Sequence, residues 1–365
     1  MKIIADMNMP RLDDTFGHHG TIIRLDGRGI KHHDLVDADV LLVRSVTRVD
    51  ADLLQGTRVR FVGSATIGID HLDTAWLEDN NIAWAHAPGC NANAAAQYTL
   101  AMMWLACERL QRDFKKQTVG IVGRGNVGKR LEHLLQALDI PVMACDPPLQ
   151  DQGEQRLVSM QKACANSIIS LHVPLTRTGK YPTRDMFDQK QLATLTSGTL
   201  LVNASRGGVI EAGALLTHLQ SGQIHAALDV WPQEPFIASE LLELVTVASP
   251  HIAGYSIEGK HAGTEMIYQA FRSALLTGTT AQKPTNDNIV ITDCPPSAPA
   301  QEILQLLMHS SCPVARDDAS LRDLPGQFDK LRSTYPARHE FKSHLIKGVA
   351  GENASLLRQM GFKTA

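Results

Sequence analysis

The sequence predicts an α/β protein with two doubly wound parallel-sheet domains and a small C-terminal α+β domain. Short runs rich in valine and isoleucine alternate with helical patterns, and these runs fall into two successive groups. Buried parallel strands typically produce such continuous apolar runs. The pattern changes from about residue 289 onward, where one apolar run mixes with amphipathic segments. A chain of 365 residues is long enough for two or three domains.

The apolar runs give the expected strands in order. The first group covers residues 2–6, 21–25, 39–45, 60–65 and 82–87. The second group covers residues 118–123, 141–146, 167–172, 199–205, 225–231 and 244–249. Each group contains enough runs to form a sheet of its own.

Two long helices are expected beside these strands. Residues 91–114 lack Gly and Pro and are rich in Ala, Leu and Met, with Asn91 or Asn93 as a candidate N-cap. A second helical pattern covers roughly residues 256–278 and could return the chain to the first domain.

The C-terminal segment of about 80 residues is small for an independent core. Its apolar side chains are therefore expected to pack on the rest of the chain or on a partner chain. Those predicted to share helical faces are Ile303, Leu306 and Leu307 in one segment, and Phe328 and Leu331 in another.

Composition narrows the functional classes. The net charge of −3 gives no broad basic field, which argues against nucleic acid as a partner. The six cysteines contain no C-x-x-C pair, so they indicate buried thiols in a reducing compartment and no metal site. The first residues do not resemble a signal peptide, and no run reaches the roughly 18 apolar residues of a membrane span.

A glycine-rich motif follows the first strand of the second group. Gly123, Gly125 and Gly128 form G-x-G-x-x-G between that strand and a helical pattern. The motif alone is weak and could be an ordinary turn, but its context favours a dinucleotide site. The glycines allow a tight turn, approach of the backbone to a pyrophosphate, and close packing of helix and strand. The helix start then favours the anion.

Asp146 ends the next expected strand. A carboxylate there can accept hydrogen bonds from the hydroxyls of the adenosine ribose, and it would repel a 2′-phosphate. The residues that follow, "PPLQDQGEQ", offer no cation to compensate. The sequence therefore predicts NAD in preference to NADP.

Three polar residues come just after later strands of the second group. Arg206, Glu234 and His251 could meet at the carboxyl ends of the strands, where open α/β sheets bind ligands. Imidazole suits proton abstraction from an alcohol, a carboxylate would orient the ring, and a guanidinium can hold a substrate carboxylate. Taken singly, each has a simpler interpretation: a surface cation, a loop acid and a strand cap.

Several motifs together resemble the D-2-hydroxyacid dehydrogenase family: "SATIGIDHLD", the glycine motif, "NASRGGVI" and "ALDVWPQEP". The resemblance covers roughly residues 1–280 and implies Rossmann-like domains. It also implies NAD-dependent oxidation of a small 2-hydroxy acid, with Arg206, Glu234 and His251 as catalytic residues. Gln97 and Val173 depart from the residues usual in the family.

The resemblance further assigns binding residues. Ser45, Thr66 and Tyr255 would contact substrate, although the hydroxyls of Ser45 and Thr66 could equally cap local structure. The cofactor would be lined by Gly123, Gly125, Asn126, Val127, Gly128, Asp146, Val173, Ala204, Ser205, Arg206, Asp229 and Gly254.

The same resemblance gives the expected domains. Residues 1–92 and 255–285 would bind substrate, 93–254 would bind NAD, and 286–365 would form a dimerisation domain. The resemblance also suggests a homodimer, while the cysteines and the lack of a signal peptide or membrane span predict a cytoplasmic protein. Two alternatives stay open: another substrate of this family, such as 3-phosphoglycerate or hydroxypyruvate, and an NAD-sensing regulator without turnover.

Overall fold

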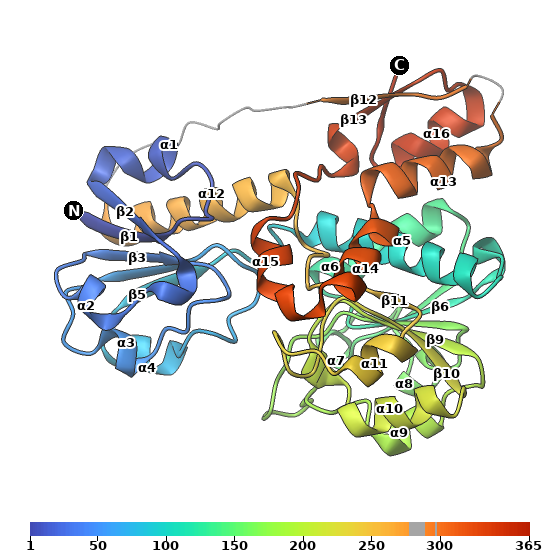
Figure 1. Ribbon diagram of the computed structural model, residues 1–365, viewed down its shortest axis with the longest axis horizontal. Helices are drawn as coiled ribbons and strands as arrows, with labels where there is room; N and C mark the ends of the chain where they lie inside the picture. Colours follow the sequence, from blue (N-terminus) through green and yellow to red (C-terminus); the bar gives the residue numbers. More distant parts are fainter. Residues whose placement is uncertain (277–288, 296–297) are drawn as a thin grey trace. The chain divides into compact units, whose positions relative to one another are not determined.

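The computed structural model describes residues 1–276, 289–295 and 298–365, which form two compact units (Figure 1). The first unit contains residues 1–91 and 256–276, and the second contains residues 92–255 with the described residues from 289 onward. Each unit has a parallel sheet, and the second unit also carries a small third sheet. The predicted fold class is confirmed.

The sheet of the first unit has the order β2-β1-β3-β4-β5, with every pair parallel. Its strands are β1 (Lys2–Asp6), β2 (Thr21–Leu25), β3 (Val40–Val43), β4 (Phe61–Ser64) and β5 (Ala83–His86). The five predicted apolar runs contain these strands and exceed them by at most two residues at either end. Apolar runs predict buried parallel strands well because both faces of such a sheet are covered.

Helix α12 (Ile257–Leu275) packs against the sheet of the first unit, where Ile267 and Phe271 are fully buried. Gly63 makes this close packing possible, since a Cβ there would lie 2.2 Å from the Cγ2 of Ile267. The helix starts where the Oγ of Ser256 accepts a hydrogen bond from Gly259 N. The remaining α-helices of this unit are α1 (Leu12–Phe16), α2 (His32–Leu35), α3 (Ala51–Leu54) and α4 (Thr74–Asp79).

The six-stranded sheet of the second unit has the order β11-β10-β9-β8-β6-β7 and is also parallel. Strands are added to one side of β6 first and to its other side from β8 onward, so the strand order reverses between β6 and β8. Doubly wound folds bind their ligands at this switch point. The strands are β6 (Val119–Val122), β7 (Val142–Cys145), β8 (Ile168–Leu171), β9 (Thr199–Asn203), β10 (Ile224–Leu228) and β11 (Val247–Ala248).

The strand expected at 244–249 is shorter than the sequence predicts. Leu244 is the last residue of α11 (Ser239–Leu244), so β11 contains only Val247 and Ala248. The apolar run continues from the helix into the strand, and periodicity alone cannot separate a buried helix end from a buried strand. The strand still leads directly to His251.

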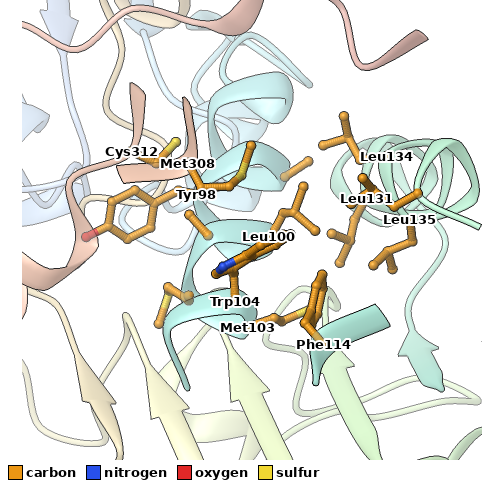
Figure 2. Packing of buried hydrophobic residues seen from close by; sticks show 14 of the residues in the cluster. Tyr98, Leu100, Met103, Trp104, Phe114, Leu131, Leu134, Leu135, Met308 and Cys312 are labelled. Carbon is orange, nitrogen blue, oxygen red and sulfur yellow. The ribbon is translucent and has the colours of Figure 1, made fainter. Parts of the chain in front are cut away.

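Helix α5 (Ala92–Arg109) lies in the core of the second unit and is buried on almost every side. Leu100 and Trp104 pack beside Leu131, Leu134 and Leu135 of α6 (Asn126–Ala137), as Figure 2 shows. A helix that is apolar around its whole circumference requires neighbours on all sides. The predicted helix over 91–114 ends early, and a turn and a short 3₁₀ segment (Phe114–Lys116) follow it.

Shorter helices complete the nucleotide-binding part of this unit. They are α7 (Pro147–Asp151), α8 (Met160–Ala163), α9 (Gln189–Ala193), α10 (Ala212–Gln220) and α11. No helix in the described parts of the chain has the length and apolarity that a bilayer crossing requires. All six cysteines are free thiols, and burial raises the pKa of Cys107 to about 11 and that of Cys164 to about 12.

The C-terminal extension is part of the second unit. It contains a parallel three-stranded sheet, β12-β13-β14, formed by Val290–Asp293, His344–Lys347 and Lys363–Thr364. Its helices are α13 (Ala300–Ser311), α14 (Val314–Asp323), α15 (Phe328–Ser333) and α16 (Gly351–Gln359). Ile303 and Leu307 join the core around α5, and Phe328 joins the core around β10. These faces are therefore covered within the same chain.

The prediction that Leu306 shares a buried helical face with Ile303 and Leu307 is wrong. This side chain is 45% exposed, whereas Leu304 is buried instead. The buried face of α13 runs through Ile303, Leu304, Leu307 and Met308, and Leu306 lies outside that stripe at helical spacing.

Candidate active site

The glycine motif lies at the switch point of the second sheet, between β6 and α6. Gly123 has a φ of 93°, and a Cβ there would meet the carbonyl oxygen of His172 at 2.6 Å. A Cβ on Gly128 would lie 2.1 Å from the carbonyl oxygen of Gly123. No side chain caps α6 at Gly125, so the backbone N–H groups of Asn126 and its neighbours can bind an anion.

Asp146 lies beside this motif, directly after β7. Its Oδ2 accepts a hydrogen bond from Arg124 N at 2.7 Å, and its Oδ1 accepts one from Leu149 N at 3.1 Å. A carboxylate has about four lone-pair sites, so two hydroxyl donors can still be accommodated.

Sequence reasoning missed Arg124, the middle residue between the first two glycines. Its guanidinium pairs with Glu132 at 2.6 Å and with Glu154 at 3.3 Å. Because two carboxylates already neutralise it, this buried cation is poorly placed to receive a 2′-phosphate. The pairing therefore agrees with a preference for NAD.

The loops after β8 and β9 carry further predicted cofactor residues. The side chain of Val173 packs on the Gly123 turn, where a Cβ on the glycine would meet it at 2.8 Å. Asn203 fixes the next loop, because its Oδ1 accepts hydrogen bonds from Ser205 N and Ser205 Oγ. Its Nδ2 donates to the carbonyl oxygen of Arg206 at 2.9 Å. Ala204 lies between these anchored residues.

The loop that carries Arg206 packs directly on the loop that carries Glu234. Gly207 makes this contact, since a Cβ there would lie 2.0 Å from the carbonyl oxygen of Trp231. The Nη1 of Arg206 donates to the carbonyl oxygen of Ser205 at 2.7 Å. The structure thus brings the Arg206 and Glu234 loops into contact through their backbones.

Glu234 and His251 are hydrogen-bonded to each other. The Nδ1 of His251 and the Oε2 of Glu234 are 2.7 Å apart, and both side chains keep partial exposure, 29% and 23%. The Oε1 of Glu234 accepts a hydrogen bond from Trp231 N. Burial alone would raise the pKa of Glu234, but the contacts with His251 and Trp231 and the charge of Arg332 together lower it. Glu234 therefore stays ionised and can stabilise a protonated imidazole.

Asp229, a predicted cofactor residue, shapes the loop around His251. Its Oδ1 accepts hydrogen bonds from Ser249 Oγ and Ile252 N, and its Oδ2 accepts one from Ala253 N. Its carbonyl oxygen accepts a hydrogen bond from His251 N at 2.7 Å. His251 itself has a φ of 56°, which costs a side-chain-bearing residue about 1–2 kcal/mol. The loop holds this conformation through a carboxylate that is almost completely buried.

Tyr255 ends the same loop, after Gly254, and meets the C-terminal extension. Its ring lies 6.0 Å from that of Tyr335 in a T-shaped arrangement, and the guanidinium of Arg332 lies 5.8 Å from its centre. The sequence pointed to Tyr255 but not to Arg332, which follows it by 77 positions and is brought beside it only by the fold.

Ser45 and Thr66 belong to the first unit. They follow the neighbouring parallel strands β3 and β4, so both lie at the carboxyl edge of that sheet. Ser45 is exposed. The hydroxyl of Thr66 donates to the carbonyl oxygen of Gly68 at 3.0 Å and lies 2.8 Å from the Oγ of Ser64. Thr66 thus supports its own turn, which was the simpler of its two interpretations.

Family comparisons agree with this geometry. Residues 85–253 match the model described as "D-isomer specific 2-hydroxyacid dehydrogenase, NAD binding domain". An erythronate-4-phosphate dehydrogenase from Marinobacter nauticus is 44% identical across all of this chain and 99% of its own length. Another, from Edwardsiella ictaluri, is 42% identical over 99% of both chains. This chain belongs to the erythronate-4-phosphate dehydrogenase family.

Solved structures show the same fold outside the erythronate-4-phosphate dehydrogenase family. D-lactate dehydrogenase from Aquifex aeolicus, complexed with NAD and lactic acid, is 21% identical with a TM-score of 0.64. It covers 75% of this chain and 95% of its own. The NAD-bound 3-phosphoglycerate dehydrogenase of Entamoeba histolytica is 21% identical with a TM-score of 0.66, over 77% and 99%. Residues 291–361 match a separate model, described as a domain of unknown function (DUF3410).

Proposed function

We propose that this protein oxidises 4-phospho-D-erythronate to 2-oxo-3-hydroxy-4-phosphobutanoate with NAD, in the biosynthesis of pyridoxine 5′-phosphate. The observation that carries the chemistry is the 2.7 Å hydrogen bond between His251 and Glu234. It lies at the carboxyl edge of the sheet that also carries the glycine motif. The substrate follows from the full-length similarity to the named relatives.

The chemistry requires a base for the hydroxyl proton of the substrate. Nδ1 of His251 is engaged by Glu234, so Nε2 is the nitrogen that takes this proton. The ionised Glu234 stabilises the imidazolium that results. Arg206 binds the substrate carboxylate and polarises the forming carbonyl group.

Bound NAD supplies the acceptor for the hydride that leaves C2 of the substrate. The residues present fit this cofactor, because Gly123 and Gly128 leave no room for side chains and α6 begins without a side-chain cap. The proposed contacts are Gly123, Gly125, Asn126, Val127, Gly128, Asp146, Val173, Ala204, Ser205, Arg206, Asp229 and Gly254. Asp229 would act through the loop whose N–H groups its carboxylate binds.

Ser45, Thr66 and Tyr255 are the proposed substrate contacts. The domain roles follow: residues 1–92 and 255–285 bind substrate, 93–254 bind NAD, and 286–365 contribute to a dimer. Partly exposed apolar side chains on the extension, such as Ile291 and Leu306, support the last role. The free cysteines agree with a cytoplasmic location.

The first prediction concerns turnover. The chain should reduce NAD with 4-phospho-D-erythronate and be much slower with 3-phosphoglycerate or D-glycerate, measured by NADH absorbance. His251→Asn should lower kcat by about 10²–10⁴, the usual contribution of a general base. NAD affinity should hardly change.

The exposed His33 provides the matched control, and His33→Asn should keep normal turnover. Near-normal kcat in His251→Asn would contradict its role as the base. If NAD binds and none of the three acids is oxidised, a regulator that senses NAD becomes the better interpretation.

The second prediction concerns pH. In Glu234→Gln, the imidazolium of His251 loses its anionic partner, so the acidic limb of the kcat/KM profile should move to lower pH. Glu240→Gln removes a carboxylate from the surface of α11 and should leave the limb in place. An unmoved limb in Glu234→Gln would argue against the pairing.

The third prediction concerns cofactor choice. Asp146→Ala should narrow the preference for NAD over NADP, because it removes both the ribose acceptor and the charge that repels a 2′-phosphate. Asp146→Asn should narrow it too while retaining an acceptor for the Leu149 N–H. Asp151→Ala, at the far end of α7, is the control. If the ratio of the two kcat/KM values stays the same, Asp146 does not select the cofactor.

The fourth prediction concerns assembly. Light scattering on the intact chain should give twice the mass of one chain over a range of concentrations, because two-fold pairing is the commonest closed arrangement. A mass of one chain at all concentrations would rule out the homodimer.

A further inference from the structure

The loop from Ser249 to Tyr255, which carries His251, is held by two ionic side chains that bind different groups of its backbone. Asp229 accepts hydrogen bonds from the N–H groups of Ile252 and Ala253. Arg338, from the C-terminal extension, donates to the carbonyl groups of the same two residues. Donors and acceptors of this short backbone segment are thus bound by a carboxylate and a guanidinium respectively.

Arg338 is 5% exposed and reaches into the core of the second unit. Its Nη2 lies 2.5 Å from the carbonyl oxygen of Ala253 and 3.5 Å from that of Ile252. Its Nη1 lies 3.4 Å from the carbonyl oxygen of Ala94, at the start of α5, and 3.6 Å from the Sγ of Cys312. Its guanidinium carbon stacks 5.0 Å from the centre of the Tyr98 ring.

Tyr98 is fixed in turn by the extension. Figure 2 shows it beside Met308 and Cys312, and its hydroxyl donates to Asp317 at 2.9 Å. The hydroxyl of Tyr335 donates to the same oxygen of Asp317 at 2.8 Å. The guanidinium of Arg338 therefore lies against a ring whose hydroxyl group is bound to Asp317.

Burying the guanidinium of Arg338 is energetically unfavourable compared with filling the same space with an apolar side chain. Removing an arginine from water costs several kcal/mol, and a well-packed apolar residue of similar volume often stabilises a protein as well or better. Among the described residues, the hydrogen-bond acceptors of Arg338 are three carbonyl oxygens and a thiol, with no carboxylate. Its contacts thus provide little ion pairing, and they fix the position of a backbone segment.

The segment bound by Arg338 directly follows His251, whose backbone and side chain must both keep a specific conformation. The residue has a left-handed backbone, and its Nδ1 must stay within hydrogen-bond distance of Glu234. Without Arg338, the carbonyl groups of Ile252 and Ala253 would lose their bonds to the guanidinium, although Asp229 would still bind the N–H groups. A displacement of about 1 Å at a reacting group can cost about 10² in rate.

We infer that Arg338 is a positioning residue for His251, and that the domain of unknown function thereby takes part in the chemistry of its own chain. This inference rests on the proposed function, because it assigns to Arg338 an effect on the base of that reaction. The effect passes through the carbonyl groups of Ile252 and Ala253, without contact between Arg338 and the substrate.

A second contact from the extension supports the same arrangement. Among the described strands β11 pairs with β10 alone, and the Oδ1 of Asp318 accepts a hydrogen bond from Ala248 N at 2.7 Å. The strand before His251 and the loop after it are therefore both bound by side chains of the segment 314–338.

The fifth prediction tests Arg338 with Arg338→Met and Arg338→Lys. The methionine variant should lower kcat about 10- to 100-fold with a much smaller change in KM and in NAD affinity. The lysine variant should lose less, because an ammonium group can reach one carbonyl but lacks the planar fork. Arg358→Met removes an exposed arginine of the same domain and should behave as the wild type.

A double-mutant cycle separates positioning from general destabilisation. If Arg338 acts through His251, then Arg338→Met should cost little further activity in the His251→Asn background. A loss by the same factor in both backgrounds would overturn the inference. If the methionine variant does not fold, the same cycle is carried out with Arg338→Lys, and a wild-type kcat in that variant overturns the inference.

Hydrogen exchange measures the loop independently of turnover. Amides of residues 249–255 should exchange faster in Arg338→Lys than in the wild type, while those of β6 to β9 should not change. Unchanged exchange in 249–255 would overturn the inference even if the substrate of the wild type proved to be a different acid. Failure of the wild type to oxidise 4-phospho-D-erythronate, in contrast, concerns only the proposed function.

Discussion

The site depends above all on the buried carboxylate of Asp229. Placed directly after β10, it collects hydrogen bonds from Ser249, Ile252 and Ala253, and so determines how the chain leaves β11. Hydrogen bonds to a buried anion are stronger than those between neutral groups, and leaving any of these partners unpaired would be costly. The left-handed turn at His251 and its bond to Glu234 both follow from this anchoring.

Much of the fold could be predicted from the sequence because its decisive signals are local. Apolar runs located the strands of both large sheets, and an unbroken helical pattern located α5 and α12. The failures occurred where two elements share one apolar run, as at Leu244, or where several leucines compete for one helix face, as at Leu304 and Leu306. Which leucine is buried depends on the surface it meets, and this surface is distant in sequence.

The residues of the site, too, could be predicted only where their signals are local in the sequence. Glu234 and His251 could be found because polar residues at the carboxyl ends of parallel strands converge in this architecture. Arg332 and Arg338 could not, because their positions in the sequence say nothing about the loop that they contact. The role of Asp229 in holding the loop around His251 was likewise visible only once its hydrogen bonds were known.

The C-terminal extension adds contacts to the loop that carries His251. The solved relatives match over nearly their whole length, yet about a quarter of this chain has no counterpart in them. In this chain Asp318 binds the backbone before His251, and Arg338 binds the backbone after it. A loop fixed at both ends loses less conformational entropy when it binds a ligand, and this preorganisation requires that the charges of the extension be buried.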